Sequence, residues 1–239
     1  MKILKFTLSG KQAMFKKPEV NTYYYFTYGQ IHKPALLGML GAVLGYGGYN
    51  QMEKEDIYPE YYDRLRTIKV SICPNAPKGY FSKKMICFNN SVGYASSEQG
   101  GNLIVKEQWL EEPSWDIYLL LDCEEAQNVS EALRDGRCEY IPYLGKNDHV
   151  ADITQVEELE GIPENSVQHL DCLFLKKQGG VDMEDFYTEN PFKYEEALPF
   201  SLQKETGFYE MEKFVYTNMP LTESKDAAFR VNEKIIVFY

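Results

Sequence analysis

Basic and aromatic side chains gather in one stretch of the sequence, residues 13–48. Lysines form charge-assisted hydrogen bonds to phosphate oxygens, and tyrosine and phenylalanine rings stack on unpaired bases. This combination indicates a binding surface for an anionic polymer rather than a pocket for a small metabolite. The candidate RNA-binding residues in this stretch are Phe15, Lys16, Lys17, Asn21, Tyr23, His32, Lys33 and Tyr46.

Acid–base chemistry has few candidate side chains in this chain. Metal-independent RNA cleavage uses a base and an acid drawn from histidine, tyrosine or lysine, and the chain contains three histidines. One alternative is a catalytic set of His32, Lys33 and Tyr46. The other, which we favour, is that His32 and Lys33 donate hydrogen bonds to phosphate beside the positive N-terminus of a helix. We therefore expect no catalytic residue.

Other enzyme classes lack their motifs. Gly45-Tyr46-Gly47-Gly48 lacks the Gly-Lys-Ser/Thr of a phosphate-binding P-loop and follows a predicted helix, whereas a P-loop precedes one. The chain has no Gly-x-Ser-x-Gly segment, which forms the nucleophile elbow of α/β-hydrolases. Adjacent acids such as Glu157-Glu158 and Glu195-Glu196 are typical of solvated segments. We expect no cofactor and no metal site.

A predicted helix over residues 34–46 must position these side chains. Pro34 suits the first helical turn, and apolar residues follow it at helical spacing. Gly38, Gly41 and Gly45 each cost roughly 1 kcal/mol relative to alanine inside a helix. They therefore indicate that another part of a structure approaches closely, either the protein's own sheet or a nucleic-acid backbone.

The first 160 residues predict a βαββαβ order. Periodicity and composition predict strands at residues 3–8, 67–73, 115–121 and 153–159, and helices at 34–46 and 124–135. This is the order of a ferredoxin-like, or RNA-recognition-motif-like, domain. Residues 161–239 contain short aromatic and β-branched segments, which predict a β-rich C-terminal appendage. The predicted fold class is α+β, with a domain at residues 1–160 and the appendage at 161–239.

A long connection between Cys73 and Trp109 interrupts this order. Residues 86–88 and 103–106 are predicted to pair as the arms of a hairpin around a polar tip, within an insertion at residues 78–106. Long connections in compact domains are usually functional, and an ordinary mobile loop is the alternative. Basic and aromatic residues lie at the base of this insertion: Lys78, Tyr80, Phe81, Lys83 and Lys84.

The charge of the chain is unevenly divided. A net charge of −11 repels phosphates as a whole. Residues 1–50, however, carry six lysines against one glutamate, whereas residues 107–239 carry eleven basic against twenty-nine acidic groups. The basic N-terminal portion therefore suits a nucleic acid, and the acidic remainder is either a solvated face or a surface for a basic partner.

The sequence contains no features of an exported or membrane protein. Five cysteines without a Cys-x-x-Cys pair are typical of reduced thiols in a cytosolic protein. Lys5 interrupts the first apolar run, which makes a poor signal peptide. Residues 34–52 are too rich in glycine and polar residues for a membrane span. We expect a cytoplasmic protein that does not contact membranes.

Two blocks of sequence resemble the CRISPR-associated Cas-five family, and most closely its type I-B branch. The first block joins Phe15-Lys16-Lys17-Pro18, Asn21 and a Tyr23-Tyr24-Tyr25 strand to residues 34–46. The second is Tyr140-Ile141-Pro142-Tyr143-Leu144-Gly145-Lys146-Asn147-Asp148, which adds Lys146 to the candidate RNA-binding residues. The C-terminal third contains no motif that aligns with the family.

The resemblance implies a ferredoxin-like fold and a non-catalytic subunit of a type I Cascade complex. Such a subunit grips the 5′ handle of the CRISPR RNA, caps the backbone filament and abuts the large subunit, so that target DNA is met only through the complex. The family has a thumb hairpin at the long connection, which wedges into the guide RNA.

One branch of the same family cleaves precursor CRISPR RNA. Those relatives carry a Lys-His pair in mid-chain, and the corresponding region of this chain reads Lys106-Glu107. A metal-independent endoribonuclease is therefore the alternative function, and RNA binding without cleavage is the expected one.

Overall fold

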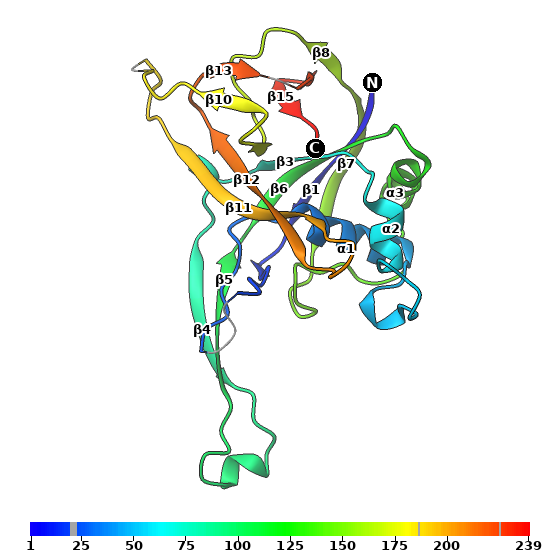
Figure 1. The fold of residues 1–239 in the computed structure, drawn as a ribbon, viewed down its shortest axis with the longest axis vertical. Helices are drawn as coiled ribbons and strands as arrows, with labels where there is room; N and C mark the ends of the chain where they lie inside the picture. Colours follow the sequence, from blue (N-terminus) through cyan, green and yellow to red (C-terminus); the bar gives the residue numbers. More distant parts are fainter. Residues whose placement is uncertain (20–22, 186, 225) are drawn as a thin grey trace.

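The computed structural model describes residues 1–19, 23–185, 187–224 and 226–239. Figure 1 shows a body of small sheets and short helices from which one long hairpin projects. The body is α+β, as predicted, and its sheets are antiparallel. Asn21, one of the predicted site residues, lies outside the described residues.

The central sheet contains four strands in the order β3-β6-β1-β7, with every neighbouring pair antiparallel. Leu4 and Phe6 face one side of this sheet and join the main core cluster, whereas Ile3 faces the other side and joins a second cluster. Both faces of the sheet are thus covered, which explains why Ile3, Leu4 and Phe6 are all fully buried. The strands are β1 (Lys2–Ser9), β3 (Val70–Pro74), β6 (Ser114–Leu120) and β7 (Asp152–Glu160).

Three α-helices occur in the described part of the chain: α1 (Lys33–Leu44), α2 (Glu60–Leu65) and α3 (Glu124–Arg134). All six elements predicted for the first 160 residues form, in the predicted order. The glycines of α1 face α2 rather than the sheet, because a Cβ on Gly41 would lie 2.4 Å from Tyr61 Cβ. The helix ends at Gly45, whose φ of 79° lies in the left-handed region that favours glycine.

The projecting hairpin is made of β4 (Lys83–Asn89) and β5 (Ile104–Glu111), with the short β2 (Gln12–Ala13) beside β5. Phe88 pairs with Val105, which confirms the predicted arms. The 3₁₀ turn η2 (Pro77–Gly79) precedes the hairpin, and η3 (Ala95–Ser97) lies at its tip (Figure 1). The predicted strand at residues 23–25 is wrong, since Tyr25 forms only an isolated bridge to Glu107.

Residues 161–239 form three small antiparallel sheets. One of them has the order β11-β12-β9 and lies against α1. Its side chains Leu198 and Phe214 belong to the same apolar cluster as Leu37 of α1. The strands are β8 (Ile162–Glu164), β9 (Phe174–Leu175), β10 (Gly179–Val181), β11 (Lys193–Leu202), β12 (Tyr209–Thr217), β13 (Leu221–Ser224), β14 (Ala228–Val231) and β15 (Lys234–Val237).

Candidate nucleic-acid interface

His32 lies inside the protein as the N-cap of α1. Its side chain is 4% exposed, and its Nδ1 accepts a hydrogen bond of 3.2 Å from the backbone N–H of Ala35. The rings of Phe15, Tyr28 and Tyr209 surround it. Burial lowers the pKa of His32 to about 3, so the ring is neutral at pH 7. The expected phosphate contact does not fit this position, and His32 instead caps the helix.

Lys33 is also buried, and its ammonium is engaged within the protein. Lys33 Nζ donates a hydrogen bond of 3.1 Å to the backbone oxygen of Tyr239, and it lies 5.6 Å from the centre of the Phe200 ring. Burial lowers the pKa of Lys33 to about 8. This lysine therefore joins the first turn of α1 to the C-terminal region rather than facing solvent.

Two lysines lie over tyrosine rings beside β5 of the hairpin. Lys16 Nζ lies 4.0 Å from the centre of the Tyr25 ring, and Lys106 Nζ lies 5.0 Å from that of Tyr24. The backbone of Tyr25 continues the edge of β5, because its N–H donates to the Lys106 carbonyl at 2.9 Å. Tyr23, which precedes Tyr24 in the chain, is 79% exposed. We call Lys16, Tyr23, Tyr24, Tyr25 and Lys106 the Lys–Tyr surface.

The Lys–Tyr surface combines the two interactions that unpaired nucleic acid uses. Its ammonium groups can pair with phosphates, and its exposed tyrosine rings can stack on bases. Lys106 was not among the residues predicted as ligands. In the register of β4 and β5, Lys106 pairs with Cys87, so the two side chains lie on the same face of the hairpin. Alternation along β5 predicts which face of the hairpin carries Lys106. Only the bridge between Tyr25 and Glu107 shows that the segment around Tyr25 lies beside this strand.

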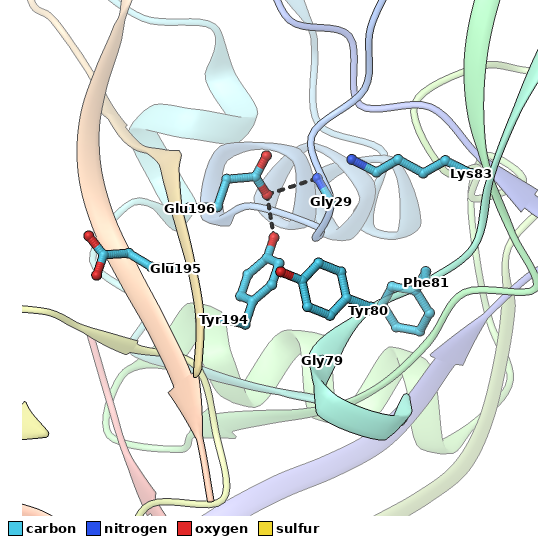
Figure 2. Close-up of a pocket in the computed structure, with 8 residues that line it drawn as sticks. All are labelled: Gly29, Gly79, Tyr80, Phe81, Lys83, Tyr194, Glu195 and Glu196. Atoms are coloured by element: carbon cyan, nitrogen blue, oxygen red, sulfur yellow. Dashed lines mark hydrogen bonds between the residues drawn. The ribbon is translucent and has the colours of Figure 1, made fainter. Parts of the chain in front are cut away.

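Lys17 points to a different place, a cleft at the root of the hairpin. Its Nζ lies 3.1 Å from Glu196 Oε1 of β11 and 5.0 Å from the centre of the Tyr28 ring. The cleft lies between the hairpin root, the loop at Gly29 and β11, and has a volume of about 190 Å³ (Figure 2). Its lining residues are Gly29, Gly79, Tyr80, Phe81, Lys83, Tyr194, Glu195 and Glu196. We call it the root cleft.

Lys83 is the second basic residue at the root cleft. Figure 2 shows its side chain directed toward the space that Glu196 also enters. Burial lowers the pKa of Lys83, and Lys83 forms no ion pair within the described residues. Sequence reasoning placed Lys17 and Lys83 in separate candidate groups, and the fold brings them to one site.

Lys146 is tied to the hairpin by an ion pair. Its Nζ lies 2.6 Å from Glu107 Oε2, and it lies over the rings of Phe88 and Trp109 at 5.5 and 5.3 Å. Glu107 is buried and also accepts a hydrogen bond of 2.8 Å from Trp109 Nε1. The second block of family resemblance is thus bound to the hairpin face that points away from Lys106.

The remaining predicted residues lie apart from one another. Phe15 is buried against Trp115. Lys78 is exposed in η2, and Lys84 forms an ion pair of 3.3 Å with Glu111. The Tyr46 hydroxyl donates a hydrogen bond of 2.7 Å to Glu125. Burial and this hydrogen bond raise the pKa of Tyr46 to about 12.

The geometry separates the groups of the proposed catalytic set. His32 precedes α1 and Tyr46 follows it, and a helix of 12 residues spans about 18 Å. His149 is 3% exposed and packs on Trp109. His169 is half exposed and lies 3.5 Å from Asp171. No two of these histidines contact each other in the described structure.

Among residues 1–19, 23–185, 187–224 and 226–239, no group of three or more histidine, cysteine, aspartate or glutamate side chains is placed to hold a metal ion. No helix in that same part of the chain is long and apolar enough to cross a membrane.

Comparison with known proteins gives a likeness of fold. No family model and no curated protein matches the chain. The structure is similar to a chain of a CRISPR RNA-guided surveillance complex, with 14% sequence identity, coverage of 92% of this chain and 91% of that chain, and a TM-score of 0.55. It also matches a CRISPR protein from Archaeoglobus fulgidus at 10% identity, with 99% and 98% coverage and a TM-score of 0.49. The first of these similarities shows a shared fold along almost the whole length of both chains.

Proposed function

We propose that this protein is a non-catalytic RNA-binding subunit of a CRISPR effector complex, and specifically a Cas-five-type subunit of a type I-B Cascade. In this role it grips the 5′ handle of the CRISPR RNA, caps the backbone filament and docks the large subunit. The observation that carries the proposal is the fold shared over 92% of the chain with a chain of a CRISPR RNA-guided surveillance complex. The two sequence blocks that resemble the family support it independently.

The central sheet supports the finer assignment of a ferredoxin-like domain. Strands β1, β3, β6 and β7, with α1 after β1 and α3 after β6, follow the βαββαβ order. Their arrangement β3-β6-β1-β7 places the first and third strands of the motif at the centre of the sheet. This arrangement is the one we expect of a ferredoxin-like, RNA-recognition-motif-like domain.

The projecting hairpin supports the proposed grip on RNA. Strand β5 has 8 residues, which extend about 26 Å at the rise of an antiparallel strand. The Lys–Tyr surface lies beside the outer half of β5, and the root cleft lies at the base of the hairpin, where Lys83 begins β4. A single strand that follows the hairpin therefore meets cations and exposed rings together, which is the combination that binds RNA without reading a duplex.

The proposed absence of catalysis is supported by the state of the histidines. His32 is a buried neutral cap, and His149 is buried against a tryptophan. Glu107, which replaces the histidine of the cleaving relatives, is engaged by Lys146 and Trp109. No acid–base pair therefore faces the Lys–Tyr surface from these residues.

The partners follow from the same proposal. The acidic C-terminal strands contain carboxylates that suit a basic neighbouring subunit, and we assign the large subunit and the backbone subunit as the neighbours. Target DNA is met only through the assembled complex. The protein acts in the cytoplasm in antiviral defence, without a cofactor.

Co-expression with the backbone subunit and a guide RNA tests the proposal. We expect the wild-type chain to co-purify with the RNA-loaded complex, and to lose this ability when the handle sequence of the RNA is scrambled. Lys16→Glu combined with Lys106→Glu should abolish loading, because two cations that face solvent become anions. Lys177→Glu, with its partner Glu212 on β12, is the matched control. Equal loading of scrambled and native handles would contradict the proposal.

A further inference from the structure

The carboxylate of Glu196 occupies a site built for an anion. The backbone N–H of Gly29 donates to Glu196 Oε2 at 2.9 Å, the Tyr194 hydroxyl donates to the same oxygen, and Lys17 Nζ lies 3.1 Å from Oε1. Figure 2 shows the first two contacts meeting at the same oxygen of this carboxylate. A backbone amide, a hydroxyl and an ammonium are the groups that proteins use to hold phosphate oxygens.

Glycine at position 29 allows the Glu196 carboxylate to lie close to the backbone N–H. A Cβ at Gly29 would lie 2.7 Å from the Tyr194 hydroxyl oxygen and 3.0 Å from Glu196 Oε2. A larger residue would therefore push the carboxylate away from the backbone amide. Close approach of an acceptor to a backbone N–H is a common reason for glycine at an anion site.

The root cleft holds more positive than negative charge. The ammonium groups of Lys17 and Lys83 both lie at the cleft, and the Glu196 carboxylate is the anion that faces them. Glu195, the next residue, does not offset this charge, because it pairs with Lys176 at 3.0 Å and Lys193 at 3.1 Å. Figure 2 shows the Glu195 carboxylate pointing away from the cleft, as strand alternation requires.

An exposed aromatic ring lies at the edge of the same cleft. Tyr80 is 64% exposed, and its ring packs edge-on against Tyr194 with centres 5.2 Å apart. One face of a largely exposed tyrosine ring can stack on a base. The cleft thus offers, side by side, donors for a phosphate and a surface for the base of the same nucleotide.

We propose that the root cleft is a phosphodiester-binding site for single-stranded RNA, and that Glu196 occupies its donors as an internal anion until RNA displaces it. A phosphate oxygen takes over the contacts with Gly29, Tyr194 and Lys17, Lys83 pairs with the same phosphate, and Tyr80 stacks on the base. This inference rests on the proposed function, since it assigns a regulated subsite of the RNA-binding surface.

Charge-neutral variants test the inference. Binding of a labelled single-stranded RNA that carries the 5′ handle is measured by fluorescence anisotropy over a series of salt concentrations. Glu196→Gln keeps an acceptor for Gly29 but frees Lys17, so it should bind RNA roughly fivefold more tightly, the upper end of the range for one ion pair near the surface. Its log–log salt slope should stay at the wild-type value, because the same phosphate is contacted in both complexes once RNA has displaced Glu196.

Two variants control this experiment. Glu195→Gln removes the same charge from the neighbouring position, outside the donor set, and should leave the RNA affinity at its wild-type value. Lys83→Gln breaks no hydrogen bond or ion pair within the described residues, so it should fold normally and lose about 0.7 of the slope. Thermal unfolding of each variant shows whether it is folded.

The outcomes separate this inference from the proposed function. If the wild-type chain binds RNA while Glu196→Gln and Lys83→Gln keep its affinity and slope, the inference is overturned and the RNA-binding function stands. If Glu196→Gln binds RNA and the wild-type chain does not, the masked site is supported and the function assigned to the unmodified chain falls. Absence of binding by all four proteins overturns both.

Discussion

Lys146 and Glu107 form an ion pair of 2.6 Å that ties the loop after α3 to the projecting hairpin. The Glu107 carboxylate also accepts a hydrogen bond from Trp109 on the same strand. Glu107 is 8% exposed, so its charge depends on these two donors for compensation. The pair therefore fixes the direction in which the hairpin leaves the body.

Removing the cation of this pair should destabilise the protein. Lys146→Met leaves a buried carboxylate without its charged donor, and we expect a loss of about 1.5–3 kcal/mol in the free energy of unfolding, the range for hydrogen bonds to charged groups. Urea denaturation followed by fluorescence measures it. The control is Lys84→Met, whose ion pair with Glu111 is solvated on the same hairpin. It should cost no more than about 1 kcal/mol, and equal losses would refute this account.

Stability should fall below neutral pH because of His32. Its pKa is about 3 in the folded protein and 6.5 in an unfolded chain, so protonation favours the unfolded state as the pH falls from 6.5 toward 3. Each pH unit in this window costs up to about 1.36 kcal/mol. His32→Asn keeps a good N-cap without the titrating ring. The stability advantage of the wild type over this variant should shrink by about 2 kcal/mol between pH 7 and pH 5. A pH-independent difference would mean that the folded protein already accommodates the charge.

The tip of the hairpin should be dispensable for folding. The last backbone hydrogen bond below the tip joins Asn90 N–H to the Leu103 carbonyl at 2.8 Å. Replacing residues 91–102 with Asn-Gly, which forms a tight two-residue turn, should change the free energy of unfolding by less than about 0.5 kcal/mol. The same variant should shift the register of guide RNA in the assembled complex, as nuclease footprinting would show. A large loss of stability would instead make the tip a structural element.

The purified chain should not cleave a repeat RNA at a specific position, with or without magnesium. General acid and base groups each contribute about 10²–10⁴-fold, so a working pair would give a visible product on a sequencing gel. His169→Ala tests the one histidine whose side chain is half exposed, and His32→Asn tests the buried histidine of the alternative catalytic set. A specific cut that either substitution abolishes would replace the binding function with the endoribonuclease alternative.

Local patterns predicted the elements of the fold well. The alternation of β1, the proline and glycines around α1, and the two arms of the hairpin all reflect interactions between near neighbours in sequence. The Tyr23-Tyr24-Tyr25 strand was expected from the family resemblance. It fails because only Tyr25 finds a partner, at Glu107.

The candidate site was harder to predict, because its geometry depends on distant residues. The basic and aromatic character of residues 13–48 is visible in the sequence, but the partners of its cations are not. Lys17 pairs with Glu196, and Lys33 donates to Tyr239. From the sequence, the His32-Lys33-Pro34 segment is therefore expected to lie on the surface. In the structure, aromatic rings from the C-terminal region cover it. The sequence gives no signal for such coverage.

The contact between Lys33 and Tyr239 joins residues 206 positions apart. Tyr239 also pairs with Val70 at the start of β3, through two backbone hydrogen bonds. During synthesis on the ribosome, α1 and β3 emerge long before the residue that completes their packing. Part of the apolar surface of the N-terminal portion therefore stays uncovered until the C-terminal residues have been synthesised. Such non-local pairing slows folding. Shortening the chain by its last strand would leave this early-made half exposed to chaperones and proteases.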